Sequence, residues 1–220
     1  MPQGSVLGPL LYLLYTGDLP TTADSTTATF ADDTTILTTH KDPAIATHRL
    51  QTNLNEIQLW LKKLCIKANE MKSVQVTFTL RKNMCSPVHL NNKQLTQTDD
   101  VKYLGIRLDQ KLTCHKHIST RSKQLGLKLC KLYCIIGQKL QLFLENKLLL
   151  YTAILKPIWT YGVQLWGSAS KSSIEILERF QSKVLRIITD ALWYVPKAVK
   201  IRDLQVLLDR QEVRNYSATY

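Results

Sequence analysis

The chain has 220 residues, of which 45% are hydrophobic and 21% charged, with only 8 Gly and 7 Pro. This composition excludes collagen-like, linker-like and disordered chains and allows one or two domains with a sizeable core. The 29 Lys and Arg outnumber the 17 Asp and Glu, and the net charge of +12 favours a polyanionic partner, nucleic acid first and an anionic membrane surface second.

The charge is unevenly distributed along the chain. Residues 1–40 contain no Lys or Arg and four aspartates, whereas the remaining 180 residues hold 29 basic and 13 acidic side chains, a net +16. A small acidic element inside a basic chain is what an enzyme needs if it holds divalent cations against a phosphate backbone. A protein that only binds nucleic acid has no use for it.

The opening apolar run, residues 6–15, is the first predicted element. It lacks basic residues before it and has about half of the ~20 residues that a membrane span requires, so we expect neither a signal peptide nor a transmembrane segment. The pattern over residues 10–14 instead predicts a short helix that begins near Pro9 and stops around Gly17.

A hairpin and a long helix are predicted next. Threonine-rich runs over residues 26–30 and 34–39 flank Ala31-Asp32-Asp33 and predict two β-strands joined by an acidic turn. Apolar residues then recur every three or four positions, which predicts a helix over residues 44–66 with one face on a sheet. The residues of that face are Leu50, Leu54, Ile57, Leu61 and Leu64.

The rest of the chain changes from mixed structure to helix. Alternation over residues 73–80 predicts a half-buried strand with Val74, Val76 and Phe78 against the long helix, and Asn91-Asn92 predicts a tight turn. Residues 103–108 predict another strand. Helical faces follow, so we expect an α+β part to about residue 110, a boundary near 109–114 and a mainly helical remainder. These faces are Ile118, Leu125, Leu129, Leu132 and Ile136, then Ile174, Leu177, Phe180, Val184 and Ile188.

The adjacent carboxylates of Asp32 and Asp33 form the first candidate site. Two carboxylates on a tight turn repel each other unless a cation lies between them, and hard cations such as Mg²⁺ prefer carboxylate oxygens. The alternative is a solvated Asp-Asp turn, and the pair Asp99-Asp100 in the same chain shows how readily such pairs arise.

Several motifs occur in an order that resembles a known family. Residues 2–10 (PQGSVLGPL) and 29–34 (TFADDT) resemble motifs B and C of the reverse transcriptases of non-LTR retrotransposons, and the jockey-like elements of arthropods are the most similar. Residues 66–73 (IKANEMKS) resemble motif D, and residues 101–109 (VKYLGIRLD) resemble motif E, the primer grip. Residues 157–162 (PIWTYG) and 165–167 (LWG) resemble a stretch that follows the thumb in these elements.

The resemblance implies a role for individual residues. Asp32 and Asp33 become the motif C ligands of a two-Mg²⁺ site, with Asp32 the more direct ligand. Gln3 and Gly4 lie beside the template base and the incoming nucleotide. Lys72 neutralises or protonates the departing pyrophosphate, although a surface lysine before a strand is an equal alternative. Further substrate contacts are expected at Phe30, Tyr103, Leu104 and Gly105.

The implied fold is α+β, a partial right-hand polymerase palm with a small antiparallel sheet, followed by a mainly helical thumb and tail. Residues 1–110 correspond to the palm, 111–155 to a thumb-like helical region and 156–220 to a post-thumb region. Residues 62–147 carry 17 Lys and Arg against 5 acids, which fits a duplex gripped through its phosphates. The predicted phosphate contacts are Arg121, Lys123, Lys128 and Lys131.

The implied activity is RNA-directed DNA polymerisation, with an RNA template, a DNA primer, deoxynucleoside triphosphates and Mg²⁺, and without a membrane. The family has a further metal-binding aspartate in motif A, N-terminal to motif B, which this sequence lacks. We therefore expect an N-terminally truncated fragment that is inactive alone. The alternative is a non-catalytic remnant that only binds nucleic acid. The life cycle of such elements implies a nuclear location.

Two further clusters have alternative interpretations. Cys114, His115, His117, Cys130 and Cys134 include zinc-ligand types, but their spacing matches no common finger and favours packing. The five cysteines of the chain, which include no CxxC pair, indicate a reducing compartment. Aromatic residues after position 155 could stack on nucleic acid, but a role in the helical core is favoured. They are Trp159, Tyr161, Trp166 and Trp193.

Overall fold

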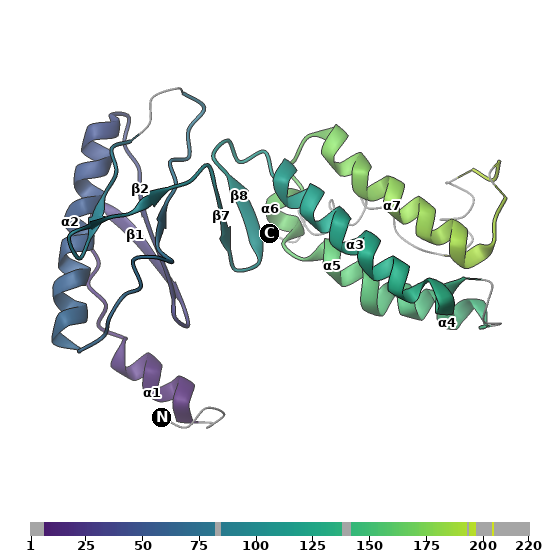
Figure 1. The fold of residues 1–220 in the computed structure, drawn as a ribbon, viewed down its shortest axis with the longest axis horizontal. Coiled ribbons are helices and arrows are strands. Elements are labelled where there is room, and N and C mark those ends of the chain that lie inside the picture. Colours follow the sequence, from purple (N-terminus) through teal and green to yellow (C-terminus); the bar gives the residue numbers. More distant parts are fainter. Residues whose placement is uncertain (1–6, 82–84, 138–141, 193, 197–203, 205–220) are drawn as a thin grey trace. The chain divides into compact units, whose positions relative to one another are not determined.

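A computed structural model describes residues 7–81, 85–137, 142–192, 194–196 and 204. The chain forms two compact units, unit 1 (Met1–Asp99) and unit 2 (Asp100–Tyr220), shown in Figure 1. Unit 1 holds α1 (Leu7–Tyr15), β1 (Ser25–Phe30), β2 (Asp33–Thr38), α2 (Pro43–Lys63), β3 (Val74–Gln75), β4 (His89–Leu90), β5 (Lys93–Gln94) and β6 (Thr96–Gln97). Unit 2 holds β7 (Asp100–Tyr103), β8 (Ile106–Asp109), α3 (His115–Ile136), α4 (Leu144–Leu150), the π-helical turn η1 (Tyr151–Leu155), α5 (Lys156–Thr160), α6 (Val163–Trp166) and α7 (Lys171–Thr189).

The mixed α/β character expected from the sequence is confirmed. Helices alternate with short strands, and the strands form four two-stranded sheets among the described residues. Three of these sheets are antiparallel and the pair of β3 with β6 is parallel. Within the described residues, no helix is both long enough and apolar enough to cross a membrane.

The predicted β1–β2 hairpin and the predicted long helix α2 are both confirmed. The strands pair antiparallel from Ser25 opposite Thr38 to Phe30 opposite Asp33. The Asp42 carboxylate caps α2 by accepting a hydrogen bond from the Ala44 amide at 3.0 Å, and Pro43 occupies the first turn. Figure 1 shows α2 beside the hairpin, so the hairpin has a helix behind it.

The long helix buries the expected face, but against a different partner. Leu54 and Ile57 are buried and Leu61 is half-buried. Leu54 packs in a small core whose other members come from both sides of the β4–β5 hairpin and from β2, and not from residues 74–78. The members of this core are Leu54, Val88, Leu90 and Leu95, with Leu50, Ile36 and Ala68 at its edge.

The strand predicted over residues 73–80 is reduced to Val74–Gln75, and its predicted inward face is wrong. Val74 is 39% exposed and Phe78 is 37% exposed, whereas Gln75 is buried. The Gln75 side chain donates to the Ser86 carbonyl at 3.0 Å and accepts from the Val88 amide at 2.9 Å. Burying this amide satisfies two backbone groups of the neighbouring segment, which outweighs the alternation of apolar residues.

The predicted turn at Asn91-Asn92 is confirmed, whereas the strand predicted over residues 103–108 is confirmed only for residue 103 and residues 106–108. Asn91 and Asn92 have φ of 50° and 62° and join β4 to β5. Residues 103–108 instead contain a second tight turn, because Leu104 and Gly105 have φ of 45° and 78° and join β7 to β8. The predicted single strand is therefore the end of a hairpin.

Unit 2 is built around one hydrophobic core between helices. Figure 1 shows α3 and α7 side by side, and the predicted apolar faces of both helices supply core residues. Trp159 and Trp166 are buried, with ring centroids 6.4 Å apart in an edge-to-face arrangement. Trp159 and Trp166 thus belong to the core as expected, whereas Tyr161 is 49% exposed and does not, and Trp193 lies outside the described residues.

The two units divide between Asp99 and Asp100, ten residues before the boundary predicted near 109–114. The β7–β8 hairpin belongs to unit 2 because its contacts are with α3 and with the segment that follows α5. These contacts link residues far apart in the sequence, so local composition does not reveal them.

Candidate functional site

The Asp32 carboxylate lies at the tip of the β1–β2 hairpin. Phe30 and Asp33 form the last pair of the ladder, so Ala31 and Asp32 make a two-residue connection. Ala31 has φ of 51°, a conformation that tight hairpin turns require and that L-residues adopt at some cost. The short connection keeps the two carboxylates next to each other at the end of the hairpin.

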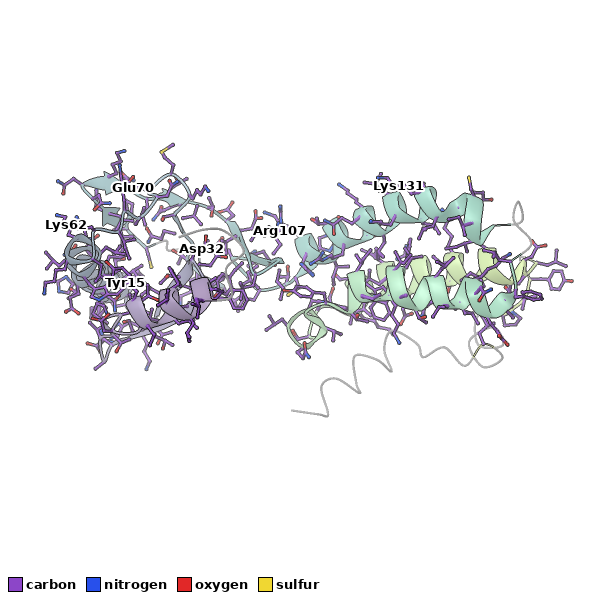
Figure 2. All side chains as sticks on the ribbon, turned by 90° about the horizontal axis from the view of Figure 1, so that it is seen from below. Tyr15, Asp32, Lys62, Glu70, Arg107 and Lys131 are labelled. Atoms are coloured by element: carbon purple, nitrogen blue, oxygen red, sulfur yellow. The ribbon has the colours of Figure 1, made fainter. Side chains whose placement is uncertain are left out.

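The tip of this hairpin is open to solvent. Asp32 and Asp33 are exposed, and neither carboxylate has a hydrogen bond or ion pair with the described residues. Phe30 beside them is 62% exposed. Figure 2 labels Asp32 and Tyr15 in unit 1. The site therefore offers carboxylate oxygens that no internal partner uses.

These oxygens suit a hard divalent cation such as Mg²⁺. The described residues contain no group of three or more His, Cys, Asp or Glu side chains that could hold a metal ion. The donor set of the tip thus fits a cation in type, and the ligand number of a complete two-metal site requires further ligands from outside the described residues.

The other end of the same hairpin is fixed to α2. Buried Asn53 donates from Nδ2 to the Thr22 hydroxyl at 2.8 Å and to the Ser25 hydroxyl at 2.6 Å. The Thr38 hydroxyl donates to the Ala46 carbonyl at 3.2 Å. The strands are held where they begin and end, and their tip projects from this support.

Lys72 lies in the loop between α2 and β3. Asn69 shapes this loop by accepting from the Met71 amide at 3.1 Å through its side chain and from the Ser73 amide at 3.1 Å through its carbonyl. Glu70, labelled in Figure 2, accepts from Asn91 Nδ2 at 2.7 Å, and this bond is the main reason that its pKa is lowered. The Lys72 side chain itself is exposed and makes no contact with the β1–β2 hairpin among the described residues.

The predicted residues Gln3 and Gly4 lie outside the described residues. The structure begins with α1, whose end is tied to α2 by a bond of 2.7 Å from the Tyr15 hydroxyl to the Leu64 carbonyl. The apolar side chains of α1 are exposed among the described residues, for example Leu14.

Tyr103, Leu104 and Gly105 lie at the turn of the β7–β8 hairpin in unit 2. Tyr103 pairs with Ile106 and closes the ladder. The Leu104 carbonyl accepts from the Tyr161 hydroxyl at 2.6 Å, and the Gly105 carbonyl accepts from Arg121 Nη2 at 2.8 Å. The structure thus joins a predicted phosphate contact, Arg121, to the predicted primer-grip turn.

Asp109 and His117 fix this hairpin to α3, Asp109 at its base and His117 through the Arg107 amide of β8. Burial raises the pKa of Asp109, but hydrogen bonds from Thr113 and Cys114 outweigh it and leave the pKa below its usual value. His117 Nδ1 accepts from the Arg107 amide at 3.1 Å. Burial, followed by the charges of Arg121 and Arg107, lowers the pKa of His117 to about 4, so the imidazole is neutral at physiological pH.

The four predicted phosphate contacts do not share one face of α3. At ~100° per residue, Lys128 lies ~20° and Lys131 ~80° around the helix from Arg121, whereas Lys123 lies ~160° away. The three lysines are exposed, and Figure 2 labels Lys131 on the side of α3 that faces solvent. Arg121 differs from them because the backbone of the β7–β8 turn already binds its guanidinium.

The candidate zinc residues are dispersed. Cys114 and His117 are buried at the start of α3, while Cys130 and Cys134 are exposed on the same helix, ~20 Å or more along its axis. Burial and the neighbouring Asp109 carboxylate raise the pKa of the Cys114 thiol, which fits a packed residue better than a ligand.

Sequence reasoning missed the contribution of Tyr161, Gly162 and His117 to the hairpin. Residues 157–162 resemble a family motif, but the sequence alone assigns that motif no role. A signal was present in Tyr161-Gly162, because Gly permits the left-handed conformation, here with φ of 69°, and a close approach of residue 162 to Ile106 of β8.

Comparison with known proteins identifies relatives over the whole chain. Residues 1–108 match the family described as reverse transcriptase (RNA-dependent DNA polymerase). The chain is 36% identical over 225 residues to the probable RNA-directed DNA polymerase from transposon X-element of Drosophila melanogaster. It is also 36% identical over 228 residues to the RNA-directed DNA polymerase from mobile element jockey of the same species. Both alignments cover 100% of this chain and 25% of the relative.

A third relative, the probable RNA-directed DNA polymerase from transposon BS of Drosophila melanogaster, is 33% identical over 230 residues, again with 25% of its length covered. The chain thus spans about a quarter of the length of the curated relatives that it matches. No solved structure shows a significant match to the chain.

Proposed function

This chain belongs to the reverse transcriptase family of the jockey-like mobile elements, and from this premise we propose that it supplies part of the active site of an RNA-directed DNA polymerase. In this proposal unit 1 is part of the palm and carries the carboxylates of motif C. The β7–β8 hairpin is the primer grip, and the helices of unit 2 form a thumb and the segment after it.

The observation that supports the proposal most directly is the open tip of the β1–β2 hairpin. Asp32 and Asp33 have no internal partner among the described residues, so their oxygens are available to a cation. Mg²⁺ bound there supplies charge stabilisation for the attacking and leaving oxygens of nucleotide transfer. The role of Asp32 and Asp33 is to hold that charge at the end of a hairpin whose base Asn53 fixes to α2.

The remaining predicted residues act on the substrates. Phe30 offers an apolar surface beside the carboxylates, and Gln3 and Gly4 approach the nucleotide and template. The Lys72 ammonium is exposed and free to neutralise the negative charge of the leaving pyrophosphate. RNA template, DNA primer and deoxynucleoside triphosphates are the proposed partners.

The experiment uses a longer polymerase, because the chain covers 25% of its relatives. The matching quarter of the X-element polymerase is replaced by this chain, and primer extension on an RNA template is measured with Mg²⁺. We expect Asp32→Asn to reduce the extension rate by at least ~100-fold, since loss of a supporting residue around a metal costs 10–100-fold and a direct ligand costs more.

Asp99→Asn is the matched control. Asp99 is an exposed aspartate of the chain's other Asp-Asp pair, so its substitution removes the same charge away from the hairpin. An active chimera in which Asp32→Asn and Asp99→Asn extend equally well would refute the metal site. The 220-residue chain by itself should show no extension with Mg²⁺ or Mn²⁺.

The alternative function is nucleic-acid binding without catalysis, and the net charge of +12 favours it. Both functions predict binding of the isolated chain to a primer-template duplex. They differ in the chimera, because a folded chimera that binds duplex but never extends the primer supports binding alone.

A further inference from the structure

The turn of the β7–β8 hairpin is held by two side chains from elsewhere in unit 2. The Tyr161 hydroxyl donates to the Leu104 carbonyl at 2.6 Å and Arg121 Nη2 donates to the Gly105 carbonyl at 2.8 Å. The Arg121 guanidinium also lies over the Tyr161 ring, 5.5 Å from its centroid. Two adjacent carbonyls of one turn thus bind two side chains that also contact each other.

Two glycines allow this close approach. A Cβ atom on Gly105 would lie 3.2 Å from Tyr161 Cε1, and a Cβ atom on Gly162 would lie 2.6 Å from Ile106 Cδ1. Both glycines also have positive φ, 78° and 69°. The hairpin and residues 161–162 therefore fit together only where side chains are absent.

The base of the hairpin is fixed independently of its turn. Asp100 accepts from Lys116 Nζ at 2.7 Å and pairs with Arg107 Nη1 at 3.3 Å. At the other strand of the base, Asp109 accepts from the Cys114 amide at 2.8 Å. Because α3 holds the base, the turn contacts of Arg121 and Tyr161 do not determine whether the hairpin forms. They determine how far its tip can move.

We propose that Arg121 and Tyr161 are positioning residues that fix the β7–β8 turn against the helices of unit 2. The proposal rests on the proposed function in one respect, that this turn contacts the primer. A displacement of about 1 Å at a substrate-positioning element can cost ~100-fold in rate, so a fixed turn is of direct use to a polymerase. Tyr161, within the motif at residues 157–162, then supports the proposed primer grip at Leu104, 57 residues earlier in the sequence.

The proposal assigns Arg121 a role different from a phosphate contact. Lysine keeps the positive charge of arginine and can still bind a phosphate, but it lacks the planar fork that bonds the carbonyl while stacking on the ring. Arg121→Lys and Tyr161→Phe both keep the net charge of the chain. Tyr161→Phe removes the donor to the Leu104 carbonyl, and Arg121→Lys removes the planar group that bonds the Gly105 carbonyl while it lies over the Tyr161 ring.

Hydrogen–deuterium exchange of the 220-residue chain tests this role. We expect the amides of residues 101–108 to exchange ~5- to 10-fold faster in Tyr161→Phe and in Arg121→Lys, since each variant weakens a turn contact that is worth about one net hydrogen bond and opposes local opening. Tyr133→Phe is the control, because this exposed tyrosine lies on α3 and its hydroxyl has no hydrogen bond with the described residues. Hairpin exchange within about twofold of the parent in both variants would overturn the proposal.

Duplex binding separates the two roles of Arg121. If the turn binds the guanidinium, Arg121→Gln leaves the slope of log K against log salt unchanged and speeds hairpin exchange. If Arg121 contacts a phosphate instead, Arg121→Gln flattens the slope by ~0.9 and Arg121→Lys leaves hairpin exchange unchanged, which would overturn the proposal.

Primer extension by the chimera gives the functional readout. Tyr161→Phe should raise KM for the primer-template ~10-fold or more and leave KM for deoxynucleotides unchanged, because only the primer end is displaced. Equal changes in both KM values would argue against positioning of the primer. A chimera that never extends would instead contradict the proposed function, while the exchange experiment still decides the role of Arg121 and Tyr161.

Discussion

The two hairpins that carry the candidate functional turns differ in how their tips are supported. The β1–β2 hairpin is fixed at its base by Asn53, while the carboxylates of Asp32 and Asp33 at its tip have no hydrogen bond or ion pair with the described residues. The β7–β8 hairpin is fixed at its base by Asp109, along β8 by His117, and at its turn by Arg121 and Tyr161. The two turns are both two-residue connections, but only the β7–β8 turn has hydrogen bonds from side chains of other elements among the described residues.

The difference fits the ligands that each turn is proposed to meet. A metal-binding turn needs carboxylate oxygens without internal partners, because a hydrogen bond or ion pair would compete with the cation. A turn that contacts a primer through its backbone needs a fixed position. Hydrogen bonds from protein donors to its carbonyl oxygens help to hold that position. Solvent exposure at Asp32 and tight packing at Gly105 are consistent with this division.

The largest expected effect concerns the support of the β1–β2 hairpin. Ile57 is buried on α2, so Ile57→Ala removes a large buried side chain from unit 1 and should lower the free energy of unfolding of this unit by ~2–5 kcal/mol. Thermal melting measures the loss of stability, and hydrogen exchange of the amides of unit 1 and unit 2 shows which unit loses it. Leu59→Ala, on the exposed face of the same helix, should have little effect.

If unit 1 and unit 2 depend on separate cores, Ile57→Ala speeds exchange in unit 1 alone. Equal loss of protection in α3 and α7 would show that the two units unfold together. In that case the two hairpins would not be supported by independent cores.

The next largest expected effect is a loss of stability at acidic pH that depends on His117, which contacts the β7–β8 hairpin. The imidazole of His117 has an ordinary pKa of 6.5 when unfolded and about 4 when folded, so the unfolded state binds a proton first as the pH falls. The stabilisation that depends on a neutral His117 is fully present above pH 6.5 and is lost as the pH falls toward 4. At pH 5 the free energy of unfolding is lower by about 2 kcal/mol. Chemical denaturation of the chain at pH 7.5 and pH 5 measures the difference.

His117→Asn is the informative variant, because an amide oxygen can still accept from the Arg107 amide but does not titrate. This variant should show a smaller loss of stability between pH 7.5 and 5 than the parent. An equal loss in both proteins would mean that other groups cause the acid sensitivity.

Sequence reasoning predicted the elements that local patterns determine. The β1–β2 hairpin, α2, the Asn91-Asn92 turn and the apolar faces of α3 and α7 all follow from periodicity and turn chemistry. It failed where a long-range contact decides the conformation. Gln75 is buried because it binds the backbone of residues 86–88, which no local pattern reveals.

The same reasoning singled out the segment proposed as the primer grip but did not predict its shape. Leu104 at φ of 45° has no sequence signal of its own, and the turn is stabilised by Tyr161, 57 residues away. The proposed metal ligands follow from adjacency and from family resemblance, and the structure adds only that their carboxylates are exposed and unpartnered within the described residues.

The close approach of residue 162 to β8 gives a smaller effect. Gly162→Ala introduces a Cβ atom at positive φ and 2.6 Å from Ile106 Cδ1, and should destabilise unit 2 by ~1–2 kcal/mol. Ile106→Val removes that Cδ1 atom. The double variant should therefore be more stable than the sum of the two single losses predicts, and strict additivity in denaturation would show that the glycine is needed for its φ alone.

The smallest expected effect concerns the exposed lysines of α3, and it sharpens the comparison between them and Arg121. Lys128 and Lys131 lie within ~60° of each other around the helix and are exposed, so both can face one phosphate strand. Replacing both with glutamine should flatten the slope of log K against log salt for duplex DNA by up to ~1.8, because each phosphate that a lysine neutralises adds ~0.9 to its steepness.

Lys62 and Lys63 at the end of α2 provide a control pair of equal charge in unit 1, with Lys62 labelled in Figure 2. If the control pair flattens the slope as much as Lys128 and Lys131 do, the duplex does not bind preferentially along α3. A larger effect of Lys128 and Lys131, together with an unchanged slope in Arg121→Gln, would show that the lysines bind the duplex while the arginine holds the turn.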